Sequence, residues 1–284
     1  MAISFDLIEP PQLWKDLYEA DLAIGLPFPP ARVLDIGKSN IYDAQEEKLR
    51  ALFQQRGLAV DECWVREFSA NSLFDPSGAR INGAFLGDLC ARIGLDYRAL
   101  DIFDAPDVLR FDLNRDTLPP DLYDAFDLVL NCGTTEHVIN QFHAFETIHS
   151  ATKPGGEMLH MVPAGGYSDH GYFSYTGRFF FDLAGYNDYE IDQLSYLCND
   201  STSRLLDPVK NYAQHFSVLR DKAAHGTIIA PEGLRPEPAL LDLTIVIRYR
   251  KKRSARFCAA LDTATSIAPP PPDMLKFYDR HAAP

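Results

Sequence analysis

Two histidines and a glutamate are the residues of this chain whose types and spacing best suit acid–base chemistry. Glu136 and His137 are adjacent and follow an apolar run, and His170 lies in a later segment rich in glycine and aromatic residues. An imidazole with an ordinary pKa of about 6.5 can accept a proton near neutral pH, so His137 and His170 are the candidate catalytic bases. Glu136 suits a bracing role, because a carboxylate in the first turn of a helix is favoured by the helix dipole.

The segment around His170 also contains the candidate substrate contacts. Tyr167, Tyr172 and Tyr175 accompany His170 within residues 165–175. Aromatic walls with a few polar anchors are typical of small-molecule pockets. A well-packed aromatic loop would have the same composition, and the sequence favours the two interpretations equally. No HxH or HExxH spacing involves the histidines, so the sequence predicts no metal site.

Alternating strands and helices are expected to position these residues. The sequence predicts strands at 33–37, 97–102, 108–112, 126–131, 157–162, 189–197 and 241–249, and helices at 44–56, 85–93, 139–152 and 178–184. Such alternation is typical of parallel βαβ units, in which ligands bind beyond the carboxyl ends of the strands. Three carboxylates, those of Asp35, Asp101 and Asp112, occur at predicted strand ends.

One ordered stretch of the sequence resembles a known family. The run Phe126–Val138 (FDLVLNCGTTEHV), the helix 141–152, the turn Lys153-Pro154-Gly155-Gly156 and the strand 157–163 follow one another in order. Together they resemble the fourth strand, helix and fifth strand of class I S-adenosylmethionine-dependent methyltransferases. The resemblance implies an α/β fold with a Rossmann-like sheet, mostly parallel with an antiparallel final strand, and helices on both faces.

The resemblance also implies S-adenosylmethionine as the cofactor. Asp35 and Gly37 resemble the end of the family's first strand, near the methionine part, and Asp101 resembles the acid that accepts hydrogen bonds from the ribose hydroxyls. Asp101 could instead merely cap the next turn. Asp112 would meet the adenine amino group, although acids are common at strand ends. The full set of implied cofactor residues is Asp35, Gly37, Ser39, Asp101, Ile102, Asp112, Leu113, Asn131, Gly133 and Glu136.

The turn after the first strand departs from the family pattern. That turn usually contains several glycines, whereas here Gly37 is followed by Lys38, Ser39 and Asn40. A lysine is unexpected beside a cofactor that carries a positive sulfonium. The departure supports an alternative in which the chain is a catalytically inactive methyltransferase-like binding or scaffold protein. A nicotinamide-dependent oxidoreductase is disfavoured, because no GxGxxG follows the first strand.

The expected reaction is an in-line displacement at the sulfonium methyl group by a small-molecule or saccharide acceptor. Methylation of oxygen is favoured over nitrogen. A hydroxyl acceptor needs a base, for which His137 and His170 are the candidates, and the protein must align the reacting atoms and exclude water.

Composition restricts the partners. A net charge of −13 argues against nucleic-acid binding, and no run approaches the ~18 apolar residues that would span a membrane. The amino-terminal residues do not resemble a secretory signal, so the cytoplasm is the expected location. The five cysteines form no CxxC pair and are expected to be reduced. A homo-oligomer is compatible with the sequence.

A basic cluster at 248–256 is interpreted as a solvated strand end, with a docking patch for an anionic partner as the alternative.

Three regions are expected along the chain. Residues 1–30 form a lead-in, residues 31–253 a methyltransferase-like domain with insertions at about 58–96 and 198–238, and residues 254–284 a carboxyl-terminal tail.

Overall fold

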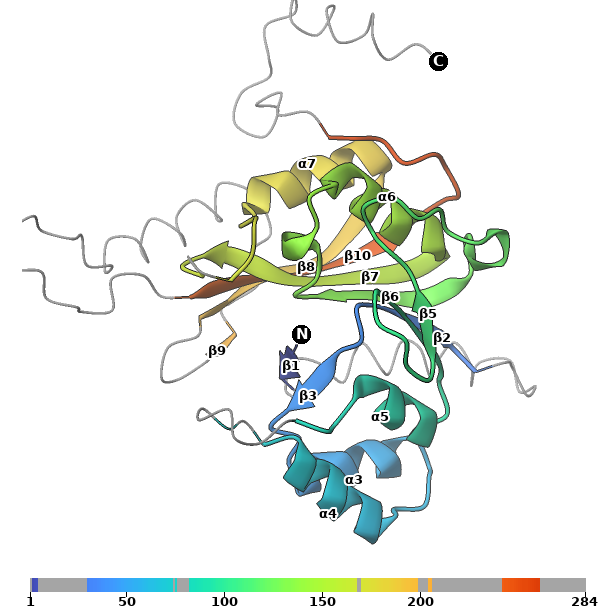
Figure 1. The fold of residues 1–284 in the computed structure, drawn as a ribbon, viewed down its shortest axis with the longest axis vertical. Helices are drawn as coiled ribbons and strands as arrows, with labels where there is room; N and C mark the ends of the chain where they lie inside the picture. The colour runs from blue at the N-terminus through green and yellow to red at the C-terminus, as the bar shows by residue number, and fades with distance from the viewer. Residues whose placement is uncertain are drawn as a thin grey trace, which may run out of the picture.

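The computed structural model describes residues 2–4, 30–73, 75, 82–167, 170–198, 204–205 and 242–260. Its centre is an eight-stranded sheet with the strand order β5-β4-β2-β6-β7-β10-β8-β9 (Figure 1). The strands are β2 (Arg32–Ile36), β4 (Asp96–Asp101), β5 (Val108–Arg110), β6 (Phe126–Cys132), β7 (Thr152–Gly165), β8 (Tyr189–Cys198), β9 (Arg204–Leu205) and β10 (Leu243–Lys251). A second, two-stranded sheet pairs β1 (Ala2–Ser4) in parallel with β3 (Asn40–Tyr42).

The large sheet is parallel on one side and antiparallel on the other. Neighbouring strands from β5 to β7 run parallel, so the ends of β2, β4 and β6 meet at one edge. β10 lies between β7 and β8 and is antiparallel to both. The predicted Rossmann-like sheet with an antiparallel final strand is therefore confirmed.

Helices cover both faces of the sheet, as predicted (Figure 1). One face carries α6 (Gln141–Ala151) and α7 (Gly177–Asn187), whose buried residues Phe145 and Phe180 join a core cluster with Val129 of β6. The other carries α3 (Glu46–Gln55), α4 (Glu62–Asn71) and α5 (Leu86–Arg92). Here Leu49 and Leu86 pack with strand residues in a second cluster. No described helix is both long and apolar enough to span a membrane.

The region 58–96 contains more regular structure than the sequence predicts. α4 is capped by Asp61, whose carboxylate accepts a hydrogen bond from the Trp64 amide at 3.1 Å. Its residues Val65 and Phe68 are buried. The segment that connects β2 to β4 therefore contributes to the hydrophobic core. The helix is only three turns long, and its apolar positions do not distinguish it from a loop by periodicity alone. The predicted insertion at 198–238 lies almost entirely outside the described residues.

The basic cluster at the end of β10 is less solvated than predicted. Lys251 is 1% exposed, and its ammonium group donates hydrogen bonds to Asp124 Oδ1 at 2.7 Å and to the carbonyls of His149 and Thr152 at 2.8 and 2.7 Å. The interpretation as a solvated strand end is therefore wrong for Lys251. Beyond it, Phe257 is buried in the core, so the first residues of the predicted tail pack on the domain.

Candidate functional site

The turn after β2 begins at a glycine that the backbone requires. Gly37 has a φ of 91°, a conformation that L side chains rarely adopt, and its amide donates a hydrogen bond to the Leu100 carbonyl of β4 at 2.7 Å. The turn is thereby attached to the neighbouring strand. Thr134, from the loop after β6, donates its hydroxyl hydrogen bond to the Ile36 carbonyl. The sequence gives no sign of this role for Thr134, because a threonine in a loop carries no local signal of such a contact.

Asp35 supports this turn from below. Its carboxylate is fully buried and accepts hydrogen bonds from the Ser39 amide at 2.9 Å, the Ser39 hydroxyl at 3.0 Å and the Tyr97 hydroxyl at 2.8 Å. Burial raises the pKa of Asp35 to about 7, although the three hydrogen bonds act in the opposite direction. Asp35 and Ser39 are thus bonded to each other and to Tyr97, and they shape the turn rather than project from it.

Asp101 lies at the end of β4, partly exposed, beside the same turn. Its Oδ2 accepts a hydrogen bond from the Lys38 amide at 2.9 Å, and its Oδ1 lies 3.4 Å from the Phe103 amide. Ile102 and Phe103 are 57% and 71% exposed, which is unusual for large apolar side chains. The Lys38 ammonium lies 4.7 Å from the centre of the Phe85 ring and 3.5 Å from the Pro106 carbonyl.

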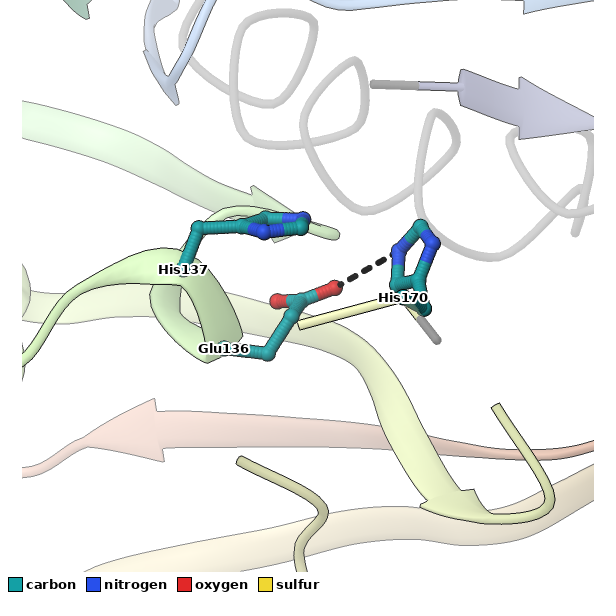
Figure 2. A group of neighbouring side chains, drawn as sticks. All are labelled: Glu136, His137 and His170. Atoms are coloured by element: carbon teal, nitrogen blue, oxygen red, sulfur yellow. Dashed lines mark ion pairs between the residues drawn. The ribbon is translucent and has the colours of Figure 1, made fainter. Parts of the chain in front are cut away.

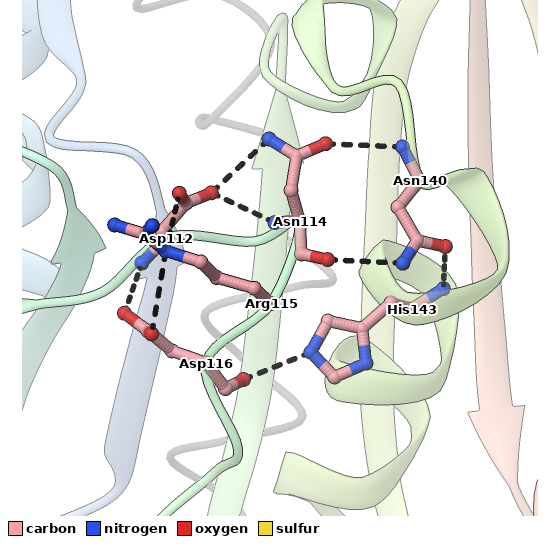
Figure 3. A network of polar contacts seen from close by, with 6 residues as sticks. All are labelled: Asp112, Asn114, Arg115, Asp116, Asn140 and His143. Carbon is pink, nitrogen blue, oxygen red and sulfur yellow. Dashed lines mark hydrogen bonds and ion pairs between the residues drawn. The ribbon is translucent and has the colours of Figure 1, made fainter.

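The loop after β5 is held by a polar network (Figure 3). Asp112 Oδ1 accepts hydrogen bonds from the amide and the side chain of Asn114 at 2.9 and 3.1 Å, and these bonds lower the pKa of Asp112. Asn114 in turn bonds to Asn140, the residue that caps α6, through two hydrogen bonds of 3.0 and 3.1 Å. The Asp112 carboxylate therefore caps its own turn in this structure, and Leu113 is buried in the core.

The loop after β6 is shaped by Asn131 near the end of the strand and by Gly133 directly after it. The Asn131 side chain is buried, donates a hydrogen bond to Thr135 Oγ1 at 2.9 Å and lies 3.1 Å from His160 Nδ1. Gly133 has a φ of 83°, and the chain then forms a short 3-10 helix, Thr135–His137. This geometry turns Glu136 into the protein and leaves His137 exposed.

The two predicted catalytic histidines meet at Glu136 (Figure 2). Nε2 of His170 lies 3.6 Å from Oε1 of Glu136, and the ring centres of His137 and His170 are 5.0 Å apart. Burial raises the pKa of Glu136 to about 7, and burial together with His170 lowers the pKa of His137. The structure thus brings together three residues that are up to 34 positions apart in the sequence, calculated as 170 minus 136.

Backbone contacts hold the loop of His170 against Glu136. The amides of Tyr172 and Phe173 donate hydrogen bonds to the Glu136 carbonyl at 2.8 and 3.2 Å. Between them and His170 lies Gly171, where an added Cβ would lie 2.9 Å from Glu136 Cγ and 3.0 Å from its carbonyl oxygen. Only a residue without a side chain allows this approach, a requirement that the sequence alone does not reveal.

The three predicted substrate tyrosines differ in their surroundings. Tyr172 is 70% exposed, whereas Tyr175 is 6% exposed and donates its hydroxyl hydrogen bond to Gln141 Oε1 at 2.7 Å. Tyr167 has a φ of 48°, lies with its hydroxyl 2.7 Å from Thr244 Oγ1 and contacts the His170 ring at a centre distance of 5.5 Å. Tyr175 therefore packs in the core beneath the loop, while Tyr172 is available at its surface.

Comparison with known families decides the classification. The model of a methyltransferase domain family matches residues 12–235, which is more than half of the chain. The chain belongs to the class I methyltransferase family. Enzymes of this family use S-adenosylmethionine, and the strand order described above is compatible with this membership. A search of curated proteins returned no match.

Several solved structures resemble the chain at low sequence identity. An S-adenosylmethionine-dependent methyltransferase from Archaeoglobus fulgidus is 14% identical, with 82% of this chain and 94% of that chain covered and a TM-score of 0.34. The YcgJ protein from Bacillus subtilis is 12% identical, with 85% and 100% covered and a TM-score of 0.34. The 1,6-didemethyltoxoflavin-N1-methyltransferase of Burkholderia thailandensis, solved with S-adenosylhomocysteine, is 14% identical, with 86% and 83% covered and a TM-score of 0.28.

Proposed function

We propose that this methyltransferase transfers the sulfonium methyl group of S-adenosylmethionine to a hydroxyl oxygen of a small-molecule acceptor, with saccharides as the first class to test. The observation that carries the proposal is the meeting of Glu136, His137 and His170 beside the carboxyl end of β6. These groups adjoin the strand ends at which ligands bind in sheets of this kind.

The residues at the ends of β2 and β4 fit the cofactor chemically. Asp101 is partly exposed at a strand end, and a carboxylate can accept two hydrogen bonds from the vicinal hydroxyls of a ribose. Ile102 and Phe103 offer exposed apolar surface to the adenine ring. The ammonium of Lys38 is directed to the Phe85 ring and the Pro106 carbonyl, so these two groups contact its positive charge. This placement supports cofactor binding despite the altered glycine turn.

The remaining cofactor residues act through the loops that they shape. Asp35 and Ser39 set the conformation of the turn at Gly37, and Asn131 and Gly133 set that of the loop after β6. Asp112 orders the loop after β5, where its backbone and that of Leu113 would border the adenine. When bound, the cofactor supplies an electrophilic methyl group.

The acceptor side of the proposal uses the loop of His170. An acceptor hydroxyl must lose its proton as its oxygen is alkylated, and His137 and His170 are the proposed catalytic residues for this step. The exposed ring of Tyr172 and the ring of Tyr167 would orient the acceptor, whereas Tyr175 supports the loop from the core. Holding the hydroxyl in line with the methyl group and excluding water contribute the rest of the rate.

Calorimetric titration with S-adenosylmethionine and S-adenosylhomocysteine tests the cofactor. Incubation with a panel of monosaccharides, phenols and amines, followed by mass spectrometry, tests the acceptor, because one transferred methyl group is detected directly. We expect binding of both cofactor forms and methylation of a hydroxyl compound. Absence of binding at millimolar cofactor would favour the non-catalytic alternative, and methylation confined to amines would contradict the oxygen assignment.

A further inference from the structure

We propose that Glu136, His137 and His170 form a binding site for a divalent first-row transition metal ion. Each of the three side chains offers one ligand atom, and these atoms all lie within 4.8 Å of one another (Figure 2). The sequence spacing did not predict this site, because the third ligand comes from a loop beyond β7. The fold alone brings it to the other two.

The buried carboxylate of Glu136 is the first argument. Its side chain is 1% exposed, and neither of its oxygens accepts a hydrogen bond from another described residue. A buried carboxylate without such partners is costly, and native structures rarely leave one unexplained. The contact with His170 at 3.6 Å is too long for a good hydrogen bond. A cation on the side that faces the two imidazoles would bind one of these oxygens and compensate the buried negative charge.

The exposure of the histidines is the second argument. The His170 side chain is 48% exposed and His137 is also exposed, so an ion could enter from solvent. The Glu136 carboxylate is thus buried among protein atoms on one side and faces two imidazoles on the other. Three protein ligands would leave coordination positions open, as in catalytic rather than structural metal sites.

The required movement is small. Ligand atoms at metal distances of about 2.1 Å are separated by roughly 3.4 Å in a tetrahedral site. The ligand atoms now lie within 4.8 Å of one another, so they must move by about 1 to 1.5 Å to reach this separation. Rotation of the two exposed imidazole side chains can provide this movement. The hydrogen bonds from Tyr172 and Phe173 to the Glu136 carbonyl keep the His170 loop in place during this adjustment.

Two imidazoles and one carboxylate define the class of metal. Imidazole ligands suit zinc, iron, nickel and copper, whereas magnesium and calcium prefer oxygen ligands throughout. We therefore assign the site to an ion of the zinc and cobalt type, and no redox change is required of it.

The chemical role of the ion rests on the proposed function. An acceptor hydroxyl bound at an open position has a lowered pKa, so its proton passes to water. The oxygen then forms its bond to the methyl carbon as the bond from carbon to sulfur breaks and the sulfonium becomes a neutral thioether. In this arrangement the ligand nitrogens of His137 and His170 bind the ion, so the two residues promote loss of the proton through the ion and do not accept it themselves.

Metal binding can be measured without any acceptor. The full chain is freed of metal with a chelator and titrated with Co²⁺, followed by visible absorption, and with Zn²⁺, followed by calorimetry. The variants are Glu136→Gln, which keeps the side-chain volume, and His170→Ala, which alters an exposed residue. The matched control is His143→Ala, because His143 also lies near a carboxylate, with 3.7 Å between its Nδ1 and Glu146 Oε2, yet stands outside the cluster.

We expect one equivalent of Co²⁺ to bind with d–d bands typical of a low-coordinate site. Both cluster variants should weaken binding about tenfold or more, and the control should retain it. Failure of the wild-type chain to bind one equivalent, or equal binding by Glu136→Gln, would overturn the site. Methyl transfer that persists in metal-free protein would overturn its role alone. Stoichiometric metal binding without cofactor binding would instead refute the proposed function and leave the site standing.

Discussion

Replacing the buried Asp35 by asparagine should change how the stability of the protein depends on pH. The carboxylate accepts hydrogen bonds from the Ser39 amide and the Tyr97 hydroxyl on Oδ2 and from the Ser39 hydroxyl on Oδ1. An asparagine can retain this arrangement. Its oxygen would take the place of Oδ2, and its amide group would donate to a Ser39 hydroxyl turned toward the Gly37 carbonyl, which lies 3.5 Å away.

The magnitude follows from the pKa of Asp35, which burial raises from 3.8 to about 7. Between these values the folded state holds a proton that the unfolded state has released, so stability falls as the pH rises. The full difference of about 3 pKa units corresponds to about 4 kcal/mol, of which about 3 kcal/mol is lost between pH 5 and pH 8. Asparagine carries no such charge. The variant should therefore gain about 3 kcal/mol relative to wild type over that range.

Urea unfolding of both proteins at pH 5 and pH 8 measures this double difference. Other titrating groups, including the buried His160 with a pKa lowered to about 3, cancel because both proteins contain them. Asp112→Asn is the matched control. The pKa of Asp112 is lowered by its hydrogen bonds to Asn114, so its contribution is constant above pH 5. A stability difference between Asp35→Asn and wild type that is the same at both pH values would refute the reasoning.

Three further predictions concern the cofactor, the core and the loop of His170. Asp101→Ala should weaken S-adenosylmethionine binding about 10- to 100-fold in calorimetry, because a charged acceptor of hydrogen bonds is lost; unchanged affinity would contradict its assignment to the ribose. Lys251→Met should lower the free energy of unfolding in urea by about 3 kcal/mol, because three buried hydrogen bonds to the ammonium disappear, and a neutral effect would count against this packing. Gly171→Ala should cost about 2 kcal/mol, because the new methyl group would overlap Glu136. Gly165→Ala, where a Cβ meets nothing within 4 Å, should change stability by less than about 0.5 kcal/mol, and equal losses in the two variants would argue against the close approach.

The sheet could be predicted from the sequence because its strands carry strong local signals. The run from Phe126 to Cys132 is nearly all buried, and a short, mainly apolar run is typical of a central parallel strand. The alternating pattern of residues 241–249 predicts the antiparallel β10, which lies two residues later, at Leu243–Lys251. The sequence does not indicate α4, because a ten-residue helix with only two buried apolar residues has a weak hydrophobic period.

The site could be predicted only as a list of residues and not as an arrangement. The identities of Glu136, His137 and His170 were available, but their meeting depends on the loop after β7 returning to β6. Gly171 makes that return possible through a contact that no spacing rule encodes. Likewise, only the hydrogen bonds from Ser39 and Tyr97 to Asp35 show that this carboxylate supports the turn and does not project toward a ligand. Long-range packing of this kind is absent from local sequence patterns.

The position of β10 has a consequence for how the chain folds. β10 pairs along most of its length with both β7 and β8, two strands that precede it in the chain and that it holds apart. Until it arrives, both strands have an unpaired edge, and exposed edges are templates for pairing with other chains. Closure must also join residues about 80 to 90 positions apart, from β7 to β10, which slows folding. Nascent or heated protein should therefore be most prone to aggregate through β7 and β8, and faster insertion of β10 would protect it.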